Sequence, residues 1–341
     1  MASEQGKQGT VSRETISDKV DMLDVARIAQ AVEKREFALP GSIKVIAPAK
    51  VNLLLNIKGR RDDGYHEVET IMHALMLHDV LLMKRVAATG SPVELTCRCF
   101  EGIPPLDIDT ESNIVWKAIV RLADEIGHEL GETETIRVHL EKHIPHQAGM
   151  GGGSSDAAAA IAGAARLWGL SPEDPRLEKV AAGLGADVAF FLRGGCAAYD
   201  GVGEHFVRSL SPMHEFVAIV KPEGGVSTAA SYAAFDADPI SIPQADLEAA
   251  QRATAGETVP LRNNMTKASE GLLPEIGEVR RWLDAQEGVR AAMMSGSGAA
   301  VFAVCESFND AANVVSAAQG KGWWARITTF SPLRAVIAPR C

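Results

Sequence analysis

"IPHQAGMGGGSSDAAAA", residues 144–160, is the stretch that most restricts the fold and function of this chain. Four glycines, Gly149, Gly151, Gly152 and Gly153, precede a polar helix start and a run of alanines. Glycine lets a backbone approach a ligand closely, and a helix N-terminus presents free N–H groups and the positive end of its dipole. The stretch therefore predicts an anion site, most often for phosphate. It matches neither the G-x-x-x-x-G-K-[ST] loop nor the Rossmann G-x-G-x-x-G pattern, and a flexible loop before a well-capped helix is the alternative.

Length, composition and charge define the class of protein. The 341 residues are enough for two domains, each with its own core. Hydrophobic residues make up 46% and charged residues 23%, and no apolar run approaches the ~20 residues that a membrane span needs. A net charge of -10 argues against a general affinity for nucleic acid or anionic membranes. We therefore expect small-molecule partners, no nucleic acid and no membrane.

Five cysteines, an odd number without paired C-x-x-C units, indicate reduced thiols and a cytoplasmic protein. Cys97 and Cys99 alternate on one face of a predicted strand, where packing explains them better than metal binding. His139, His143 and His146 do not follow a recognised zinc spacing. We expect no structural metal.

The order of predicted elements indicates an α+β fold. Residues 1–42 form an extension that lacks a secretion segment, and apolar residues at helical intervals in 18–36 predict one amphipathic helix or a frayed extension. From residue 43 the chain predicts two strands joined at Pro48, further strands, and a helix with Ser112 as its N-cap. Strands and helices restart near residue 214 without forming regular βαβ units. We therefore expect two domains, 43–210 and 211–341.

Four stretches resemble the kinase family named after galactokinase, homoserine kinase, mevalonate kinase and phosphomevalonate kinase (GHMP kinases). They are "PAKVNLLLNIKGRRDDGYH" (48–66), the glycine loop, "LGADVAFF" (184–191) and "MMSGSGAAVFAV" (293–304), and the resemblance covers nearly all of residues 43–340. It implies a two-domain fold, with an N-terminal ATP-binding domain similar to ribosomal protein S5 domain 2 and a C-terminal α+β substrate domain. Within the family, the motifs look closest to a kinase whose substrate carries a cytidine diphosphate group.

The resemblance also implies catalytic roles. Asp187 matches the family's catalytic base and Lys50 the lysine beside it. A carboxylate can take the proton of a substrate hydroxyl, while a fixed ammonium stabilises charge near the transferring phosphoryl group. From its local sequence alone, Asp187 could be a helix N-cap and Lys50 a strand-edge lysine whose charged end reaches solvent.

Further residues acquire binding roles by the same resemblance. Tyr65 and His66 would contact the cytidine by stacking and hydrogen bonding, although an ordinary turn would have the same sequence. For the sugar, Ser227, Thr228 and Ser231 remain open, as do Tyr232 and Phe235 for the cytidine pocket. The expected ATP-binding residues are Asn113, Lys142, Ala148, Gly149, Met150, Gly151, Gly152, Gly153, Ser154 and Ser155. The expected substrate residues are Asn52, Tyr65, His66 and Ser227, and the supporting third motif is Ser295, Gly296, Ser297 and Gly298.

The implied cofactor is ATP with Mg²⁺, whose protein ligands the sequence leaves unknown apart from Ser155 as a candidate hydroxyl. We expect a monomer or a weak homodimer. Two other functions remain: another kinase of the family, of the mevalonate or homoserine type, and a catalytically silent ligand sensor. The presence of both Lys50 and Asp187 argues against the sensor.

Overall fold

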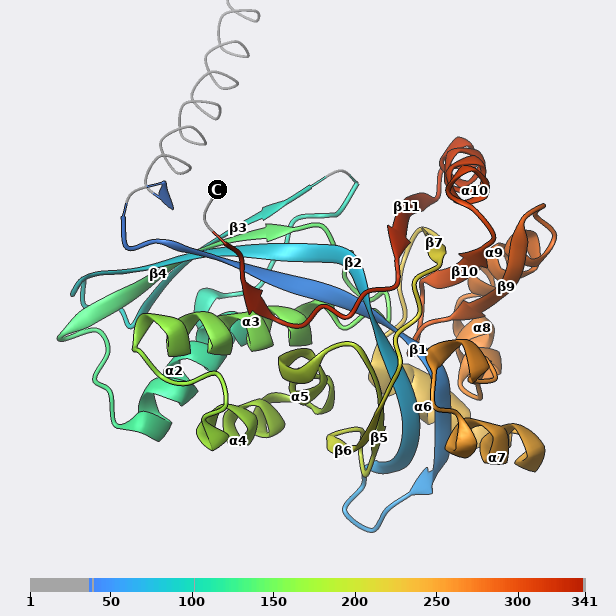
Figure 1. Ribbon diagram of the computed structural model, residues 1–341, viewed down its shortest axis with the longest axis horizontal. Coiled ribbons are helices and arrows are strands. Elements are labelled where there is room, and N and C mark those ends of the chain that lie inside the picture. Colours follow the sequence, from blue (N-terminus) through green and yellow to red (C-terminus); the bar gives the residue numbers. More distant parts are fainter. Residues whose placement is uncertain (1–36, 39, 101, 340–341) are drawn as a thin grey trace, which may run out of the picture. The chain divides into compact units, whose positions relative to one another are not determined.

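The computed structural model describes residues 37–38, 40–100 and 102–339 (Figure 1). The helix predicted within residues 18–36 lies outside the described residues. Ile43–Cys341 forms one unit, separate from Met1–Ser42, and the structure below is that of the Ile43–Cys341 unit.

Two long antiparallel strands, β1 (Ile43–Arg60) and β2 (His66–Ala87), run through the centre of the first sheet. The prediction of two strands joined at Pro48 is wrong, because β1 continues through the proline. The register shifts there, so that Pro48 lies opposite His78 and Lys50 opposite Ala74. A β-bulge of this kind accommodates a residue that lacks an N–H donor. The long strand thus carries Lys50 directly after the irregularity.

The rest of the first sheet comes from both halves of the chain. On the side of β2, the strands follow the order β1-β2-β4-β3, and β5 with its partner β6 also joins β2. On β1, the short strands β8 and β12 add residues from far along the chain, as the dark red segment in Figure 1 shows for β12. The bounds are β3 Val93–Cys99, β4 Glu134–Lys142, β5 Cys196–Asp200, β6 His205–Leu210, β8 Arg262–Asn263 and β12 Val336–Ile337.

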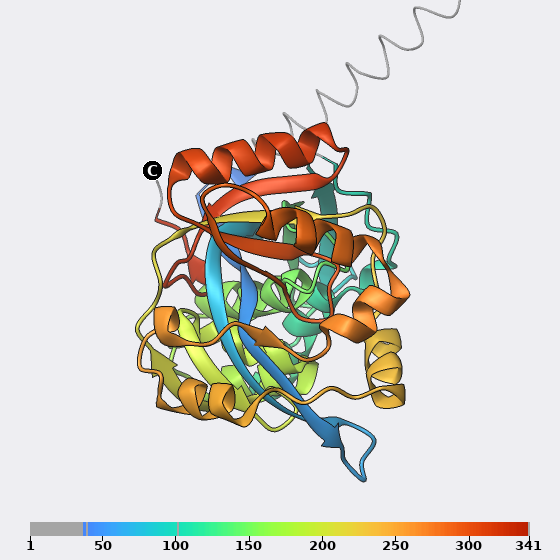
Figure 2. The ribbon, with the colours of Figure 1, turned by 90° about the vertical axis from the view of Figure 1, so that its right-hand side faces the viewer.

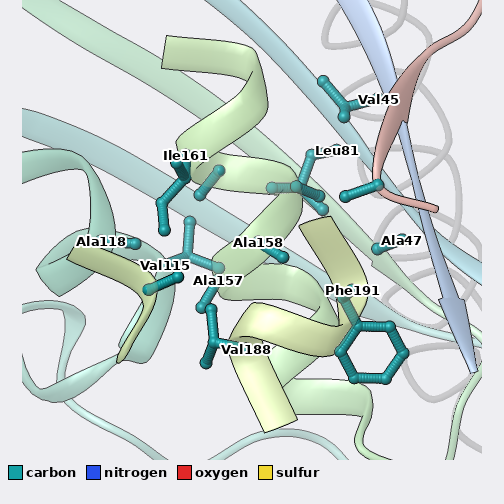
Figure 3. Packing of buried hydrophobic residues seen from close by; sticks show 14 of the residues in the cluster. Val45, Ala47, Leu81, Val115, Ala118, Ala157, Ala158, Ile161, Val188 and Phe191 are labelled. Atoms are coloured by element: carbon teal, nitrogen blue, oxygen red, sulfur yellow. The ribbon is translucent and has the colours of Figure 1, made fainter. Parts of the chain in front are cut away.

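Four helices cover one face of this sheet: α2 (Ile114–Ile126), α3 (Gly152–Leu167), α4 (Pro175–Leu184) and α5 (Ala186–Arg193). Figure 3 shows Ala157 and Ala158 of the central helix α3 among Val115 of α2, Val188 of α5 and the strands. Both alanines are fully buried, and their small side chains let α3 pack closely against its neighbours. This packing fixes the position of the α3 N-terminus, which follows the glycine loop.

The N-cap of α2 is Asn113 and not Ser112, as the sequence had predicted. Ser112 ends a short 3-10 helix, η1 (Thr110–Ser112). The Asn113 Oδ1 accepts a hydrogen bond of 2.9 Å from the backbone N–H of Val115. An asparagine side chain at this position satisfies one of the free N–H groups of the helix.

The second sheet has the order β11-β7-β10-β9, all antiparallel, and Figure 2 shows α10 across its outer side. Alternate residues of β7 face opposite ways. Val217 and Ile219 pack in the same core as Val51 of β1, whereas Ala218 and Val220 pack in the core that contains the helices. The strands are β7 Phe216–Lys221, β9 Val289–Met294, β10 Val301–Cys305 and β11 Trp324–Thr329. The helices are α6 Thr228–Ala237, α7 Gln244–Arg252, η2 Gly256–Thr258, α8 Thr266–Leu272, α9 Glu275–Asp284 and α10 Phe308–Gly320.

Two mostly antiparallel sheets with helices on their outer faces confirm the α+β class. The boundary between domains near residue 210 stays a prediction. In the described ranges, no helix combines the length and the apolar character needed to cross a membrane.

The four cysteines among the described residues are free thiols. Cys196 and Cys305 are buried, but Cys97 is exposed and Cys99 only partly covered. The expected packing of Cys97 is wrong, because its side chain is exposed on β3, the strand at the end of the order β1-β2-β4-β3 in the described sheet. The described part of the chain contains no cluster of three or more His, Cys, Asp or Glu side chains that could hold a metal ion.

Candidate active site

The glycine loop lies against the third motif and against Lys50. Gly149 and Gly151 have φ angles of 70° and 68°, which favour glycine. A Cβ on Gly149 would lie 1.9 Å from the backbone oxygen of Ser295, and one on Gly151 would lie 2.8 Å from the Phe191 ring and 3.3 Å from the Lys50 side chain. These two glycines are therefore required by close approach as well as by backbone conformation.

Three hydrogen bonds join the third motif to the glycine loop. The Ser295 Oγ donates to the Gly149 carbonyl at 2.9 Å, and the Ala299 N–H donates to the Gln147 carbonyl at 3.0 Å. The Ala300 N–H donates to the Ala148 carbonyl at 3.2 Å. The third motif thus fixes the backbone of the loop, a contact between segments about 150 residues apart that the sequence did not reveal.

Lys50 and Asp187 form an ion pair beside the loop. The Lys50 Nζ lies 3.5 Å from the Asp187 Oδ2, with the lysine side chain 4% exposed and the aspartate 33% exposed. The same Nζ donates to the Asn52 Oδ1 at 2.7 Å, and the Asn52 Nδ2 donates to the Thr70 Oγ1 at 2.8 Å. This chain of hydrogen bonds holds a charged ammonium in a buried position, with an accessible carboxylate next to it.

This geometry excludes the two simpler explanations for the pair. The N-cap of α5 is Gly185, so Asp187 lies inside the first turn and is not the cap. Lys50 is buried, so its charged end does not reach solvent along a strand edge.

An aromatic group lies at the other end of the site. The rings of His66 and Tyr232 are stacked, with centroids 4.5 Å apart and an interplanar angle of 30°. The His66 Nε2 donates to the Asp236 Oδ1 at 2.6 Å. Burial, with a smaller effect of the Asp187 charge, raises the pKa of Tyr232 to about 12, so its hydroxyl keeps its proton at neutral pH. Phe235 is buried in the core behind this group and does not line the site.

The glycine loop, the Lys50–Asp187 pair and the aromatic group of His66 and Tyr232 line one cavity of about 1170 Å³. A typical pocket for one ligand has about 300–1,000 Å³, so this cavity lies just above that range. Its walls come from both sheets. Of the predicted residues it is lined by Lys50, Asn52, Tyr65, His66, Lys142, Ala148, Gly149, Met150, Gly151, Gly152, Gly153, Ser154, Asp187, Ser227, Gly296, Ser297 and Gly298.

Comparison with known proteins identifies the family. Residues 113–195 match the model of the GHMP kinases N terminal domain, and residues 245–322 match the model of the GHMP kinases C terminal domain. A curated protein of Desulfitobacterium hafniense, named 4-diphosphocytidyl-2-C-methyl-D-erythritol kinase, is 37% identical over 279 residues, which cover 80% of this chain and 91% of that protein. The chain belongs to the GHMP kinase family. It is therefore an enzyme, a kinase with the two-domain GHMP fold expected from the sequence.

Solved structures agree with this family. A crystal structure of 4-(cytidine 5'-diphospho)-2C-methyl-D-erythritol kinase superimposes with a TM-score of 0.66 at 31% identity, covering 85% of this chain and 100% of that chain. A homoserine kinase from Cytophaga hutchinsonii has a TM-score of 0.64 at 20% identity, with coverage of 88% and 98%. At that lower identity, the likeness extends to the fold of the GHMP kinases alone.

Three of the residues predicted for this GHMP kinase do not line the cavity: Asn113, Ser155 and Ser295. Asn113 caps α2, and Ser295 supports the glycine loop. The Ser155 Oγ is buried at the N-terminus of α3 and has no hydrogen-bond partner among the described residues.

Lys142 lines the cavity, but its charge is shared with two buried carboxylates. The Nζ lies 2.6 Å from the Asp156 Oδ2 and also contacts the Asp79 Oδ2. Burial opposes the lysine charge, yet the two carboxylates outweigh it and raise the pKa of Lys142. This cluster joins β2, the end of β4 and the N-terminal part of α3 beneath the glycine loop.

Of the three hydroxyls left open for the sugar, Ser231 is fully buried and bonds to the third motif and Ser269. Ser227 and Thr228 line the cavity. The Ser227 Oγ accepts from the Ala230 N–H as the N-cap of α6, and the Thr228 Oγ1 lies 3.2 Å from the Ser297 Oγ.

The sequence predicted no role for two residues beside this site, Asp236 and Asn263. Asp236 was not considered, although it lies four residues after Tyr232, a spacing that puts both on one face of a helix. The Asn263 Nδ2 donates to the carbonyls of Met294 and Gly296 at 3.0 and 2.8 Å, so it holds the third motif in place.

Proposed function

We propose that this kinase transfers the γ-phosphoryl group of ATP to the 2-hydroxyl of 4-diphosphocytidyl-2-C-methyl-D-erythritol, in the non-mevalonate pathway to isoprenoid precursors. The observation that carries the proposal is the cavity of about 1170 Å³, in which the Lys50–Asp187 pair lies between a glycine loop and an aromatic group. The name of the 37% identical relative supports the same substrate. The proposed enzyme acts in the cytoplasm, as a monomer or a weak homodimer.

The glycine loop is the proposed ATP site. GHMP kinases bind ATP, and the N-terminus of α3 directs free N–H groups and its positive dipole end toward the loop. Residues 148–154 all line the cavity. Lys142 lies beneath the loop and Asn113 caps the adjacent helix α2, so we propose that both shape the adenosine end.

Lys50 and Asp187 are the proposed catalytic residues. Asp187 accepts the proton of the substrate hydroxyl while the hydroxyl oxygen attacks the γ-phosphorus and ADP leaves. The buried Lys50 ammonium, held by Asn52, stabilises the negative charge that develops on the oxygen and on the phosphoryl group. Because Asp187 is one-third exposed, a substrate hydroxyl can reach it from the cavity.

Magnesium fits this site as a partner of the ATP phosphates. Mg²⁺ takes few ligands from proteins and keeps waters and phosphate oxygens. Ser154 lines the cavity, and the buried Ser155 Oγ has no partner within the described ranges, so these two hydroxyls are the candidate protein ligands. When bound, the ion would neutralise charge on the β- and γ-phosphates.

The aromatic end is the proposed cytidine site. Tyr65 is 65% exposed on the turn between β1 and β2, and its ring is free to stack on a base. His66 and Tyr232 form the other wall, so Tyr232, and not Phe235, completes the proposed pocket. Ser227 and Thr228, between this wall and the third motif, are the proposed contacts of the sugar.

A kinase of the homoserine or mevalonate type is the second candidate, since the homoserine kinase shares the fold. Its substrate has no base, so it would not need an aromatic wall at His66 and Tyr232. A silent ligand sensor is disfavoured by the intact Lys50–Asp187 pair.

The test is ADP release from ATP and Mg²⁺ by the purified protein. The substrates compared are 4-diphosphocytidyl-2-C-methyl-D-erythritol, the same sugar phosphate without cytidine, homoserine and mevalonate. We expect turnover with the cytidine compound alone. Turnover with another alcohol would overturn the substrate, and no turnover with any of them would support the sensor.

A further inference from the structure

Asp236 lies beside the aromatic group formed by His66 and Tyr232, and it has no role in the function proposed so far. It lies on α6, one helical turn after Tyr232, and both residues line the cavity. The His66 side chain between them is only 9% exposed. It is fixed on one side by stacking on Tyr232 and on the other by the 2.6 Å hydrogen bond from Nε2 to the Asp236 carboxylate.

This hydrogen bond determines which ring nitrogen carries the proton. An ionised carboxylate only accepts hydrogen bonds, so the His66 Nε2 must be the protonated nitrogen. In the neutral ring Nδ1 is then an acceptor. An acceptor at this position pairs with a donor on a ligand and is repelled by a carbonyl oxygen.

Cytosine and uracil differ in this property. Cytosine carries an N4 amino donor where uracil carries the O4 acceptor. A site that leaves a buried polar group unpaired with the wrong ligand discriminates strongly against that ligand. The tautomer of one histidine can therefore select between the two bases.

We propose that Asp236 is a positioning residue that holds His66 as the Nε2–H tautomer and thereby makes the cavity prefer cytosine to uracil. This inference rests on the proposed function, because it assumes that the base of the substrate lies against His66. Asp236 acts through His66 and does not touch the reacting atoms.

The variants Asp236→Asn and Asp236→Ala separate tautomer control from simple support. An asparagine can accept from a protonated Nε2 or donate to an unprotonated one, so it keeps a hydrogen bond but no longer selects the tautomer. An alanine removes both. Asp238→Asn is the matched control, because Asp238 lies just after α6, is 67% exposed and pairs with Lys267 on the surface.

The first measurement is the affinity for CDP and for UDP at pH 8, with β,γ-imido-ATP saturating the ATP site. We expect the wild-type chain and Asp238→Asn to bind CDP at least about tenfold more tightly than UDP, within the range that one good base contact contributes. In Asp236→Asn this ratio should fall severalfold, and the KM for the cytidine substrate should rise by a larger factor than kcat falls. A wild-type ratio near one, or a full ratio in Asp236→Asn, would overturn the inference.

The second measurement is the imidazole ¹⁵N spectrum, with the His66 signals assigned by their loss in His66→Gln. We expect the proton on Nε2 in the wild-type chain and a mixture of tautomers in Asp236→Asn. A wild-type His66 protonated on Nδ1 would overturn tautomer control directly.

These readouts separate the two proposals. If the wild-type chain fails to phosphorylate the cytidine compound but His66 keeps the expected tautomer only with Asp236 present, the proposed substrate is wrong and the positioning role stands. If it phosphorylates that compound and Asp236→Asn keeps the full CDP preference, the substrate stands and the role of Asp236 is wrong.

Discussion

At the scale of single residues, the two charges at the centre of the cavity lie in different environments. Lys50 is almost fully buried and Asp187 is partly open to the cavity. We predict that Asp187→Asn and Lys50→Met each reduce kcat by at least about 100-fold, the order that a general base or one electrostatic contact contributes. Their thermal unfolding should change little, because neither substitution leaves a bulky gap in a core. Steady-state ADP release and thermal unfolding of each variant measure both effects.

A matched control for this prediction is Lys58→Met. Lys58 lies on the same strand β1, but it is 46% exposed and pairs with Glu69 on the surface. Its removal should leave turnover within about twofold, because an exposed ion pair is worth little. Near wild-type turnover in pure Asp187→Asn or Lys50→Met would remove that residue from the mechanism.

At the scale of elements, the contact between the glycine loop and the third motif leaves very little space for a side chain larger than glycine. We predict that Gly149→Ala reduces kcat/KM for ATP by at least about tenfold, because its Cβ would lie 1.9 Å from the Ser295 carbonyl and its φ of 70° strains any other residue. Gly169→Ala is the control at a similar φ of 73°, since an added Cβ there would have no neighbour within 4 Å and Gly169 does not line the cavity. Equal kinetics in the two variants would contradict a role for this contact.

The sequence predicted local features of the site well and contacts between distant segments poorly. The loop glycines, Lys50 and Asp187 were predicted because each stands in a short motif. Whether Ser295 lies against Gly149, 146 residues away, depends on how the second sheet packs on the first. Asp236 was missed for the same reason, since its partner His66 comes from the hairpin of the other sheet.

The fold was predictable to a similar extent. The strand pattern and the periodicity of α2 indicated the α+β class, but Pro48 suggested a strand end where the structure has a bulge. A proline removes one hydrogen bond in either case, and only the register of the partner strand decides between the two outcomes. That register depends on residues 75–78 of β2, which a local reading of β1 does not include.

At the scale of the whole molecule, His73 of β2 contacts two distant parts of the chain. They are the segment around Met213, which leads into the second sheet, and the C-terminal segment around Phe330. Its Nδ1 donates to the Ala74 carbonyl, its Nε2 accepts from the Met213 N–H at 2.8 Å, and its ring packs on Phe330. Burial lowers the pKa of His73 to about 4. The folded protein therefore holds this ring neutral at a pH where an unfolded chain would protonate it.

This difference predicts a loss of stability in mild acid. Above pH 6.5 the histidine is neutral in both states, and between pH 6.5 and about 4 the unfolded state binds the extra proton, so stability falls as the pH falls. The expected loss from His73 is about 2 kcal/mol between pH 7.5 and pH 5. Urea unfolding at the two pH values should show a smaller loss for His73→Gln than for the wild-type chain. His205→Gln, at a side chain that is 68% exposed, should keep the wild-type loss, and a loss in His73→Gln equal to that of the wild-type chain would contradict the prediction.

The pairing of β12 with β1 has a consequence for the synthesis of this protein. Val336 and Ile337 lie opposite Ile46 and Val45, and the Ala335 N–H donates to the Phe191 carbonyl. A ribosome makes residues 335–337 only after the other strands of the two described sheets. Until those residues emerge, the outer edge of β1 lacks its partner and is open to pairing with other chains. Nascent chains that stall before residue 335 should therefore depend on chaperones, although the proposed catalytic residues Lys50 and Asp187 have already been made.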